Sequence, residues 1–406
     1  MRLHPGPSDR LTQRRPPGYP DRMPPDFAHR TTQMRPFFAM DVMERAVEME
    51  RSDENVIHLE LGEPDFPAHP AAAAACIRAI ESGQTHYTDS RGLLELREAI
   101  ADDHRRRFGV DVEPERIFVA NGTSPAMLSV FSLLVGEGDE VVLAAPHYPC
   151  YPNIIRMCGG APVVIPADPE TGYAVDVDAV RRALTPRTRA IIVSSPANPT
   201  GAVQSEKTMR GLVSLGVPII SDEIYDGLLY DGAKVTSALQ ISDDVYVLDG
   251  FSKRYAMTGY RLGYAIVPHA SVRAIQVMQQ NLFISTNCFV QHAGIAVLRD
   301  RSDALEEMLA AYTRRRRLLI DGLRELGFRI PVEPKGAFYV FADARAFDSD
   351  SLRLAHALLE RAKVATAPGI DFGEAGEGWL RFAYAKSEAD IEVALERLAA
   401  ALPRLR

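Results

Sequence analysis

Patterns of metal-binding residues are scarce in this 406-residue sequence. The four cysteines are scattered, with no Cys-x-x-Cys pair and no spacing suited to zinc. The ten histidines likewise form no His-x-x-x-His or His/Cys cluster. The sequence therefore indicates no metal site, and scattered cysteines fit a reducing compartment. These cysteines are Cys76, Cys150, Cys158 and Cys288.

An excess of basic residues is also lacking, as are long apolar runs. With 46 Lys and Arg against 54 Asp and Glu, the net charge is −8, which argues against a nucleic-acid partner. No apolar run approaches the length of a membrane span. The N-terminus lacks the apolar core of a secretory signal, and its prolines and aspartates are atypical of a transit peptide. We therefore expect a cytoplasmic protein that binds neither nucleic acid nor membrane.

The composition of the first 34 residues differs from that of the rest. Residues 1–34 are rich in Pro and Arg and poor in large aliphatic residues, which predicts a disordered leader. Met23 and Met34 within it are candidates for the true start of the protein. The remaining chain is too long for one compact core, so we expect two domains.

Short apolar runs alternate with helical patterns over the middle of the chain. Such runs are typical of a mostly parallel sheet that is buried on both faces. The sequence thus predicts an α/β large domain at 67–299 with a seven-stranded sheet. After residue 300 the pattern changes to a smaller α+β domain at 300–406, which we expect residues 35–66 to join. The strands of the large domain are expected at 117–120, 140–145, 162–165, 190–194, 217–221, 246–248 and 262–267.

Polar residues follow three of these predicted strands directly. Asn198 comes after the strand at 190–194, Asp222 and Tyr225 follow the strand at 217–221, and Ser252 and Lys253 follow the strand at 246–248. The carboxyl ends of strands in a doubly wound sheet line one crevice, where ligands bind. The sequence therefore predicts a single site at this edge.

In chain order and spacing, these residues resemble the class I (class I/II) aminotransferases of fold type I, which depend on pyridoxal 5′-phosphate (PLP). The resemblance covers roughly residues 35–400 and rests on the motif sequence rather than on one glycine pattern. Its motifs are Asn198-Pro-Thr-Gly201, Asp222-Glu-Ile-Tyr225, Ser252-Lys253, Arg261 and Arg381.

The resemblance implies a role for each residue around the PLP ring. Lys253 would form the Schiff base and, once released, move the α-proton of the substrate, which requires a lowered pKa. Asp222 would keep the pyridine nitrogen protonated. Tyr225 and Asn198 would donate hydrogen bonds to the phenolic oxygen. Tyr148 matches the aromatic residue that stacks on the ring.

The phosphate would be held by backbone N–H groups at a helix start and by side chains. Gly122, Thr123 and Ser124 precede Pro125, a residue favoured in the first helical turn, where N–H groups and the helix dipole attract an anion. Ser252 and Arg261 match the remaining phosphate contacts of the family.

Three further residues carry implications for the substrate and for assembly. Arg381 matches the arginine that binds the α-carboxylate, and a planar guanidinium suits that task. Gly62 lies in the turn that commonly closes over this carboxylate in the family, and Asn198 is a further candidate for substrate binding. Tyr87 matches the tyrosine that reaches the phosphate of the neighbouring subunit, so the resemblance implies a homodimer with shared sites.

Aminotransfer between an amino acid and a 2-oxo acid is the reaction that the resemblance favours. A PLP-dependent lyase or cyclase, performing elimination or substitution in secondary metabolism, is the alternative on the same scaffold. A PLP-fold transcription regulator is disfavoured because the leader is too short and too rich in proline for a helix-turn-helix.

The substrate is expected to have a neutral side chain. Related enzymes that act on acidic substrates place a Lys where this chain has Ser124, or an Arg in the segment before the second domain. Here no Lys or Arg occurs between Arg273 and Arg299.

Overall fold

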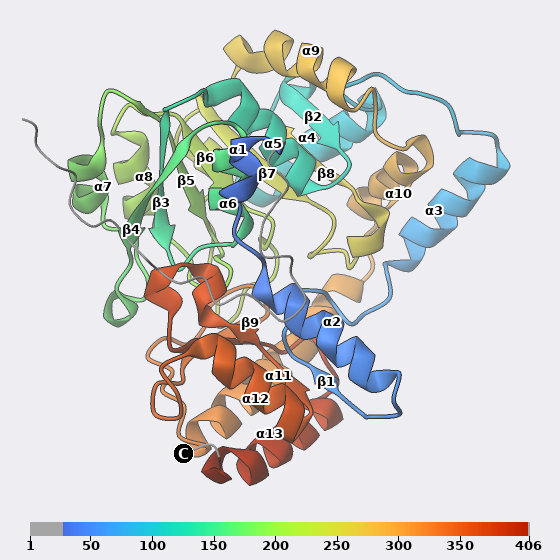
Figure 1. Cartoon of the computed structure of the whole chain (residues 1–406). Helices are drawn as coiled ribbons and strands as arrows, with labels where there is room; N and C mark the ends of the chain where they lie inside the picture. Colours follow the sequence, from blue (N-terminus) through green and yellow to red (C-terminus); the bar gives the residue numbers. More distant parts are fainter. Residues whose placement is uncertain (1–26, 405–406) are drawn as a thin grey trace, which may run out of the picture.

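A seven-stranded sheet forms the centre of the larger part of the protein (Figure 1). The computed structural model describes residues 27–404. The strand order is β2-β8-β7-β6-β5-β3-β4, and only β8 runs antiparallel to its neighbours. The mostly parallel α/β sheet predicted from the sequence is confirmed. Its strands are β2 (Ile117–Ala120), β3 (Glu140–Ala145), β4 (Ala161–Pro166), β5 (Thr188–Ser194), β6 (Ile219–Asp222), β7 (Val245–Gly250) and β8 (Gly263–Ile266).

Alternate residues of each strand point to opposite faces of this sheet, and both faces are covered. Ile191 and Val193 of β5 belong to one apolar cluster, whereas Ala190 and Ile192 belong to another. This period of two explains why the strands are nearly continuously apolar. The first face is covered by α3 (Pro70–Glu81), α4 (Leu94–Phe108), α7 (Val177–Ala183), α8 (Glu206–Val213) and α10 (Cys288–Arg299), and the second by α5 (Thr123–Leu134), α6 (Cys150–Met157) and α9 (Val272–Leu282).

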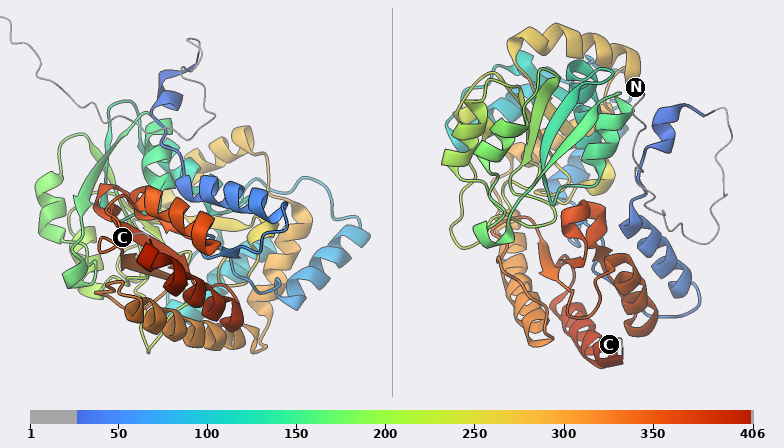
Figure 2. Two further views of the ribbon diagram at one scale, coloured as in Figure 1. Left: turned by 60° about the horizontal axis from the view of Figure 1, so that its bottom comes forward. Right: turned by 60° about the vertical axis from the view of Figure 1, so that its left-hand side comes forward.

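The C-terminal residues form a smaller α+β part that includes an early segment of the chain. Helix α2 lies beside α12 although about 300 residues separate them in sequence (Figure 2). Strand β1 pairs in parallel with β10, and β11, β12 and β9 form an antiparallel sheet. These elements are α2 (Phe38–Glu50), β1 (Ile57–His58), α11 (Ala304–Glu325), β9 (Tyr339–Asp343), α12 (Ser351–Ala362), β10 (Val364–Ala365), β11 (Ala367–Pro368), β12 (Trp379–Ala383) and α13 (Glu388–Ala401).

The secondary structure differs from the sequence pattern in several segments. The segment at 56–61 alternates apolar and polar residues and so predicts a strand, but it forms only the two-residue β1. The strand expected at 328–331 forms only an isolated bridge between Arg329 and Asp343. Pro331 ends the second segment because proline cannot donate to a sheet. Residues 1–26 of the predicted leader lie outside the part of the chain that the structure describes. The last part of the leader contains the short helix α1 (His29–Thr32).

No helix between residues 27 and 404 is long and apolar enough to span a lipid bilayer.

The packing of α13 makes one testable prediction about stability. Ile391 is fully buried in the core of the smaller part, whereas Val393 on the same helix is 38% exposed. We expect Ile391→Ala to lower the free energy of unfolding by about 2–5 kcal/mol because a cavity forms in the core. Val393→Ala, the matched control, should change it by less than about 0.5 kcal/mol. Urea unfolding followed by far-UV circular dichroism measures both, and equal losses would contradict the packing described.

Candidate active site

A cavity of about 330 Å³ lies at the carboxyl ends of β5, β6 and β7. Its walls come from both parts of the protein, since the start of α2 and residues of β9 and β12 also line it. Strand pairing brings Ser194 of β5 next to Asp222 of β6. Most residues selected from the sequence line this one cavity, namely Gly62, Thr123, Ser124, Tyr148, Asn198, Asp222, Tyr225, Ser252, Lys253, Arg261 and Arg381.

Asp222 is a buried carboxylate held by a tyrosine. Its Oδ2 accepts a hydrogen bond of 2.6 Å from the hydroxyl of Tyr151, and its Oδ1 accepts one of 3.3 Å from the N–H of Ile224. Burial raises the pKa of Asp222, while these hydrogen bonds and the positive charge of Lys253 oppose that rise. A cation placed against Asp222 would favour its ionised form further.

Lys253 carries an amine of lowered basicity. Burial of the ammonium lowers its pKa to about 8, and the positive charges of Arg381 and Arg261 add to this effect, whereas the negative charges of Glu63 and Asp222 oppose it. Its Nζ donates a hydrogen bond of 2.5 Å to the carbonyl oxygen of Gly62. A neutral amine, which can attack an aldehyde or accept a proton, is thus available near physiological pH.

Arg381 is buried with only 2% of its surface exposed, and it connects the two parts of the protein. Its Nη1 donates a hydrogen bond of 2.9 Å to Oδ1 of Asn198, and its Nη2 donates to the carbonyl oxygen of Glu60. The guanidinium carbon lies 4.3 Å from the ring centre of Tyr339. Among residues 27–404, Nε of Arg381 has no hydrogen-bond partner. The group is therefore fixed while one donor remains free.

The helix start after β2 approaches Arg261 closely. A Cβ atom at Gly122 would lie 2.6 Å from Nη2 of Arg261, and the φ of +100° at this residue also favours glycine. Thr123 and Ser124 form the first turn of α5, so this helix begins two residues before Pro125, where the sequence predicts its start. Their free N–H groups and the arginine together suit an anion such as a phosphate.

Tyr87 does not reach this cavity within its own chain. Its side chain is 81% exposed, and it is absent from the cavity wall. The fold therefore brings the predicted site residues to one cavity, with two exceptions. Tyr87 does not line it, and Gly122 lies behind the wall as the N-cap of α5.

Two tyrosines of the site are missing from the sequence-based selection. Tyr151 holds Asp222, and Tyr339 shares a hydrogen bond of 2.6 Å with the hydroxyl of Tyr225. Tyr151 lies in the first turn of α6, and Tyr148 precedes this helix, which begins at Cys150. Pro149 and Pro152 make this segment look like a loop in the sequence, because proline is disfavoured inside a helix. Nothing in the sequence distinguishes Tyr339 from a core residue of β9.

Solved structures of the same architecture exist. An aspartate aminotransferase from Thermus thermophilus, solved with maleate, superposes with a TM-score of 0.89 at 37% identity, covering 93% of this chain and 99% of that one. An aminotransferase from Mycobacterium tuberculosis gives a TM-score of 0.88 at 38% identity, with the same coverage. The fold is thus that of the PLP-dependent aminotransferases, and the expected fold class is confirmed.

The sequence comparison gives the family. The profile described as "Aminotransferase class I and II" matches residues 54–398. An aspartate/prephenate aminotransferase from Thermus thermophilus is 38% identical over 93% of this chain and 99% of its own length. A valine–pyruvate aminotransferase from Mycobacterium tuberculosis is 39% identical over 91% and 96%. This chain belongs to the class I and II aminotransferases, and it is an enzyme that transfers amino groups.

The family depends on PLP, and the residues of the cavity fit that cofactor. The close approach at Gly122 leaves a cradle of N–H groups and a guanidinium for a phosphate. Asp222 is a buried carboxylate suited to a protonated ring nitrogen, and Lys253 is an amine of lowered pKa suited to an aldehyde. The donor set therefore matches the three chemical features of PLP.

The lowered pKa of Lys253 predicts how its reactivity depends on pH. In cofactor-free protein, acetylation of Lys253 by acetic anhydride should rise with pH, with a midpoint near the pKa of about 8. Only the neutral amine reacts, so the modified fraction increases as the proton is lost. Peptide mass spectrometry measures it, with the exposed Lys207 as the internal reference.

A variant gives the sign of the electrostatic contribution. Glu63→Gln removes the negative charge that most favours the ammonium, so the midpoint for Lys253 should move to lower pH. A midpoint above pH 10 in the unmodified chain, or a shift upward in this variant, would contradict the assignment.

Proposed function

We propose that this enzyme transfers the amino group of an amino acid with a neutral side chain to a 2-oxo acid, with PLP bound at Lys253, as a cytoplasmic homodimer. The observation that carries the proposal is the position of Lys253, Asp222 and Arg381 in the wall of one cavity. These groups suit, respectively, an aldehyde, a ring nitrogen and a carboxylate. The four cysteines are free thiols, which fits a reducing compartment.

Each part of PLP has residues that would hold it. The first turn of α5, Ser252 and Arg261 would bind the phosphate. Asp222 would bind the ring nitrogen, with Tyr151 keeping the carboxylate in place. Oδ1 of Asn198 already accepts from Arg381, so its amide N–H groups remain free to donate to the phenolic oxygen, together with the hydroxyl of Tyr225. When bound, PLP supplies an aldehyde carbon that carries the amino group and a ring that accepts electrons.

The chain's own residues position the substrate and move its proton. Arg381 would bind the α-carboxylate through its free Nε and an Nη group, which orients the α-carbon. Lys253, as a neutral amine, would take the proton from the α-carbon of the substrate and deliver it to the carbon that PLP would supply. A base with a pKa of about 8 is well matched to this transfer near neutral pH.

The cavity wall favours a neutral substrate side chain. Phe37, Met40 and Met127 contribute apolar surface to it. The three cationic side chains of the wall are those of Lys253, Arg261 and Arg381, and each has a role above. A hydrophobic wall discriminates weakly between apolar side chains of similar size, so several neutral amino acids should be accepted.

A second copy of the chain is the partner that best explains the exposed apolar residues near Tyr87. Ile77 and Ile80 lie three residues apart on α3, and both are about half exposed. The N–H of Thr88 donates 3.3 Å to Oγ of Ser285, which joins the Tyr87 loop to the half-exposed Ile284. Helix α3 packs against α10 at the edge of the molecule (Figure 1). Such a surface is typical of a protein interface.

A panel of single amino acids tests both the proposed reaction and the proposed substrate class. PLP-loaded enzyme is mixed with single amino acids in the absence of any 2-oxo acid, and the released 2-oxo acid is quantified. We expect about one equivalent per site and no further turnover, because no acceptor regenerates the enzyme. Lys253→Ala should slow the release by roughly 100-fold or more, whereas Lys207→Ala should not.

Two results would contradict the proposal in different ways. Continuous release of ammonia or of a side-chain fragment without an acceptor would identify a lyase or cyclase. If glutamate and aspartate exceed alanine, valine and phenylalanine in kcat/KM, the aminotransfer holds but the neutral preference is wrong.

The shared site is tested with the hydroxyl of Tyr87. Tyr87→Phe should weaken PLP binding by roughly fivefold, the value of one hydrogen bond, without changing the mass of the dimer. Fluorescence titration of cofactor-free protein and light scattering measure these quantities. Unchanged affinity, or a mass equal to one chain, would contradict the role of Tyr87.

Hybrid dimers distinguish a shared site from an indirect effect. In a dimer of one Tyr87→Ala chain and one Lys253→Ala chain, one site would contain both native residues. Mixing the two variants should therefore raise activity above the sum of the separate preparations. An additive result would show that each chain completes its own site.

A further inference from the structure

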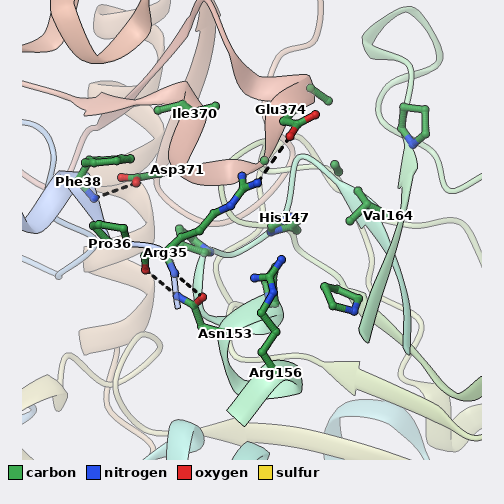
Figure 3. Close-up of a pocket in the computed structure, with 17 residues that line it drawn as sticks. Arg35, Pro36, Phe38, His147, Asn153, Arg156, Val164, Ile370, Asp371 and Glu374 are labelled. Carbon is green, nitrogen blue, oxygen red and sulfur yellow. Dashed lines mark hydrogen bonds and ion pairs between the residues drawn. The ribbon is translucent and has the colours of Figure 1, made fainter. Parts of the chain in front are cut away.

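A second cavity of about 380 Å³ lies beside the catalytic one and shares none of its catalytic side chains. It is bounded by the segment before α2, by α6, by the edge strand β4 and by the turns at Gly369–Phe372 and Glu374–Gly376. Figure 3 shows Arg156 reaching from α6 toward His147, while Arg35 crosses the same space with its guanidinium turned toward Glu374.

Arg156 is an incompletely paired cation in this cavity. Its Nη1 atom is buried and has no hydrogen-bond partner among the described residues. Burial lowers the pKa of Arg156, and the positive charge of Arg35 lowers it further. A buried donor without an acceptor is costly, and two neighbouring guanidinium groups repel each other. Both costs would be relieved by an anion.

The other titratable groups of the wall do not supply that anion. Asp371 accepts hydrogen bonds of 2.9 and 2.8 Å from the N–H groups of Phe38 and Ala39, so its oxygens cap α2. Glu374 is largely exposed and lies 3.6 Å from Arg35. Burial lowers the pKa of His147 to about 4, and its Nδ1 lies 3.1 Å from the carbonyl oxygen of Tyr148, so the ring is a neutral donor to that oxygen.

Asn153 also lines the cavity, but its Oδ1 accepts from the N–H of Arg35 and its Nδ2 donates to the carbonyl oxygen of Arg35. Most of the remaining side chains of the wall are apolar, and they restrict the kind of anion. A phosphate would need hydrogen-bond donors around several of its oxygens, and apolar side chains provide none. A carboxylate needs only the guanidinium edge and can place an apolar body against the wall. The apolar residues are Phe38, Pro152, Pro162, Val164, Pro166 and Ile370.

We propose that this cavity is a binding site for a monocarboxylate with an apolar body, whose carboxylate is bound by Arg156 and Arg35. Arg156 anchors it through its guanidinium group, and Arg35 closes over it from the exposed side. The site is separate from the substrate site at Arg381. It shares two structural elements with that site, because Tyr148 and Tyr151 of the α6 region and Phe37, Ala39 and Met40 at the start of α2 line the catalytic cavity.

The test uses PLP-loaded enzyme and 4-phenylbutyrate, which has no amino or oxo group and cannot react. Equilibrium dialysis counts all bound probe, and the visible absorbance of the cofactor reports the probe in the catalytic cavity alone. We expect two equivalents per chain, of which one leaves the absorbance unchanged. Arg156→Gln should weaken that silent equivalent by roughly tenfold or more, and Arg35→Gln should weaken it less.

Matched variants separate the two sites and control for folding. Arg381→Gln should weaken only the equivalent that changes the absorbance. Arg182→Gln, at a side chain that is 71% exposed, should change neither. Because Arg156 lacks a partner, Arg156→Gln should melt without the probe at a temperature no lower than the unmodified enzyme. The probe should raise the melting temperature more in the unmodified enzyme.

Two further probes test the chemical class. 4-Phenylbutanol lacks the charge and inorganic phosphate lacks the apolar body, so both should bind the silent site at least roughly tenfold more weakly than 4-phenylbutyrate. A single equivalent that is lost in Arg381→Gln, or a silent equivalent unaffected by Arg156→Gln, would overturn the proposal. Phosphate competing as well as 4-phenylbutyrate would overturn the assigned class. None of these outcomes depends on turnover, so the proposed reaction is tested independently.

Discussion

The buried guanidinium of Arg381 is the constraint on which the site depends. A buried cation is costly, and no carboxylate lies within ion-pair distance of it in the described part of the chain. Its stability comes instead from the oxygens of Asn198 and Glu60 and from the ring of Tyr339. These groups come from the sheet, from the segment after α2 and from β9. Keeping Arg381 in place therefore requires that the two parts of the protein meet at this edge.

The charge of Arg381 also sets the properties of its neighbours. Burial is the main cause of the lowered pKa of Lys253, and the positive charges of Arg381 and Arg261 lower it further. Asp222 and Glu63 limit that effect, so the amine keeps a pKa of about 8 rather than losing its proton altogether. Positive and negative groups are thus fixed before any substrate arrives. Preorganised charge of this kind is a major source of catalysis, because no reorganisation is required during the reaction.

The sequence predicted the parts of this arrangement that follow from strand order. Asn198, Asp222 and Lys253 each follow a buried strand, and parallel strands bring their carboxyl ends to one edge. Sequence reasoning did not reach Tyr151, which depends on the course of α6. Proline is tolerated at the start of a helix but is read as a break, which explains the omission.

Contacts between segments that are distant in the sequence also could not be predicted from it. Tyr339 lies within an apolar strand, and its partners Tyr225 and Arg381 are remote in sequence. The two-residue strand β1 is equally hard to predict, since the alternating segment at 56–61 is long enough for a strand three times that length. Only its pairing partner β10 limits it, and that partner ends at Ala365.

Arg381 and Arg156 differ in how far the protein satisfies their hydrogen-bond donors. Both are partly or fully buried arginines without a carboxylate partner in the described chain. Arg381 has two oxygen acceptors and aromatic rings, so the protein can hold it ready for a substrate. Arg156 has apolar neighbours and a second guanidinium, so the fold offers it no comparable compensation. A buried donor that the protein does not satisfy is stabilised when a ligand supplies the acceptor. Arg156 therefore gains more from an external anion than from any rearrangement of its own surroundings.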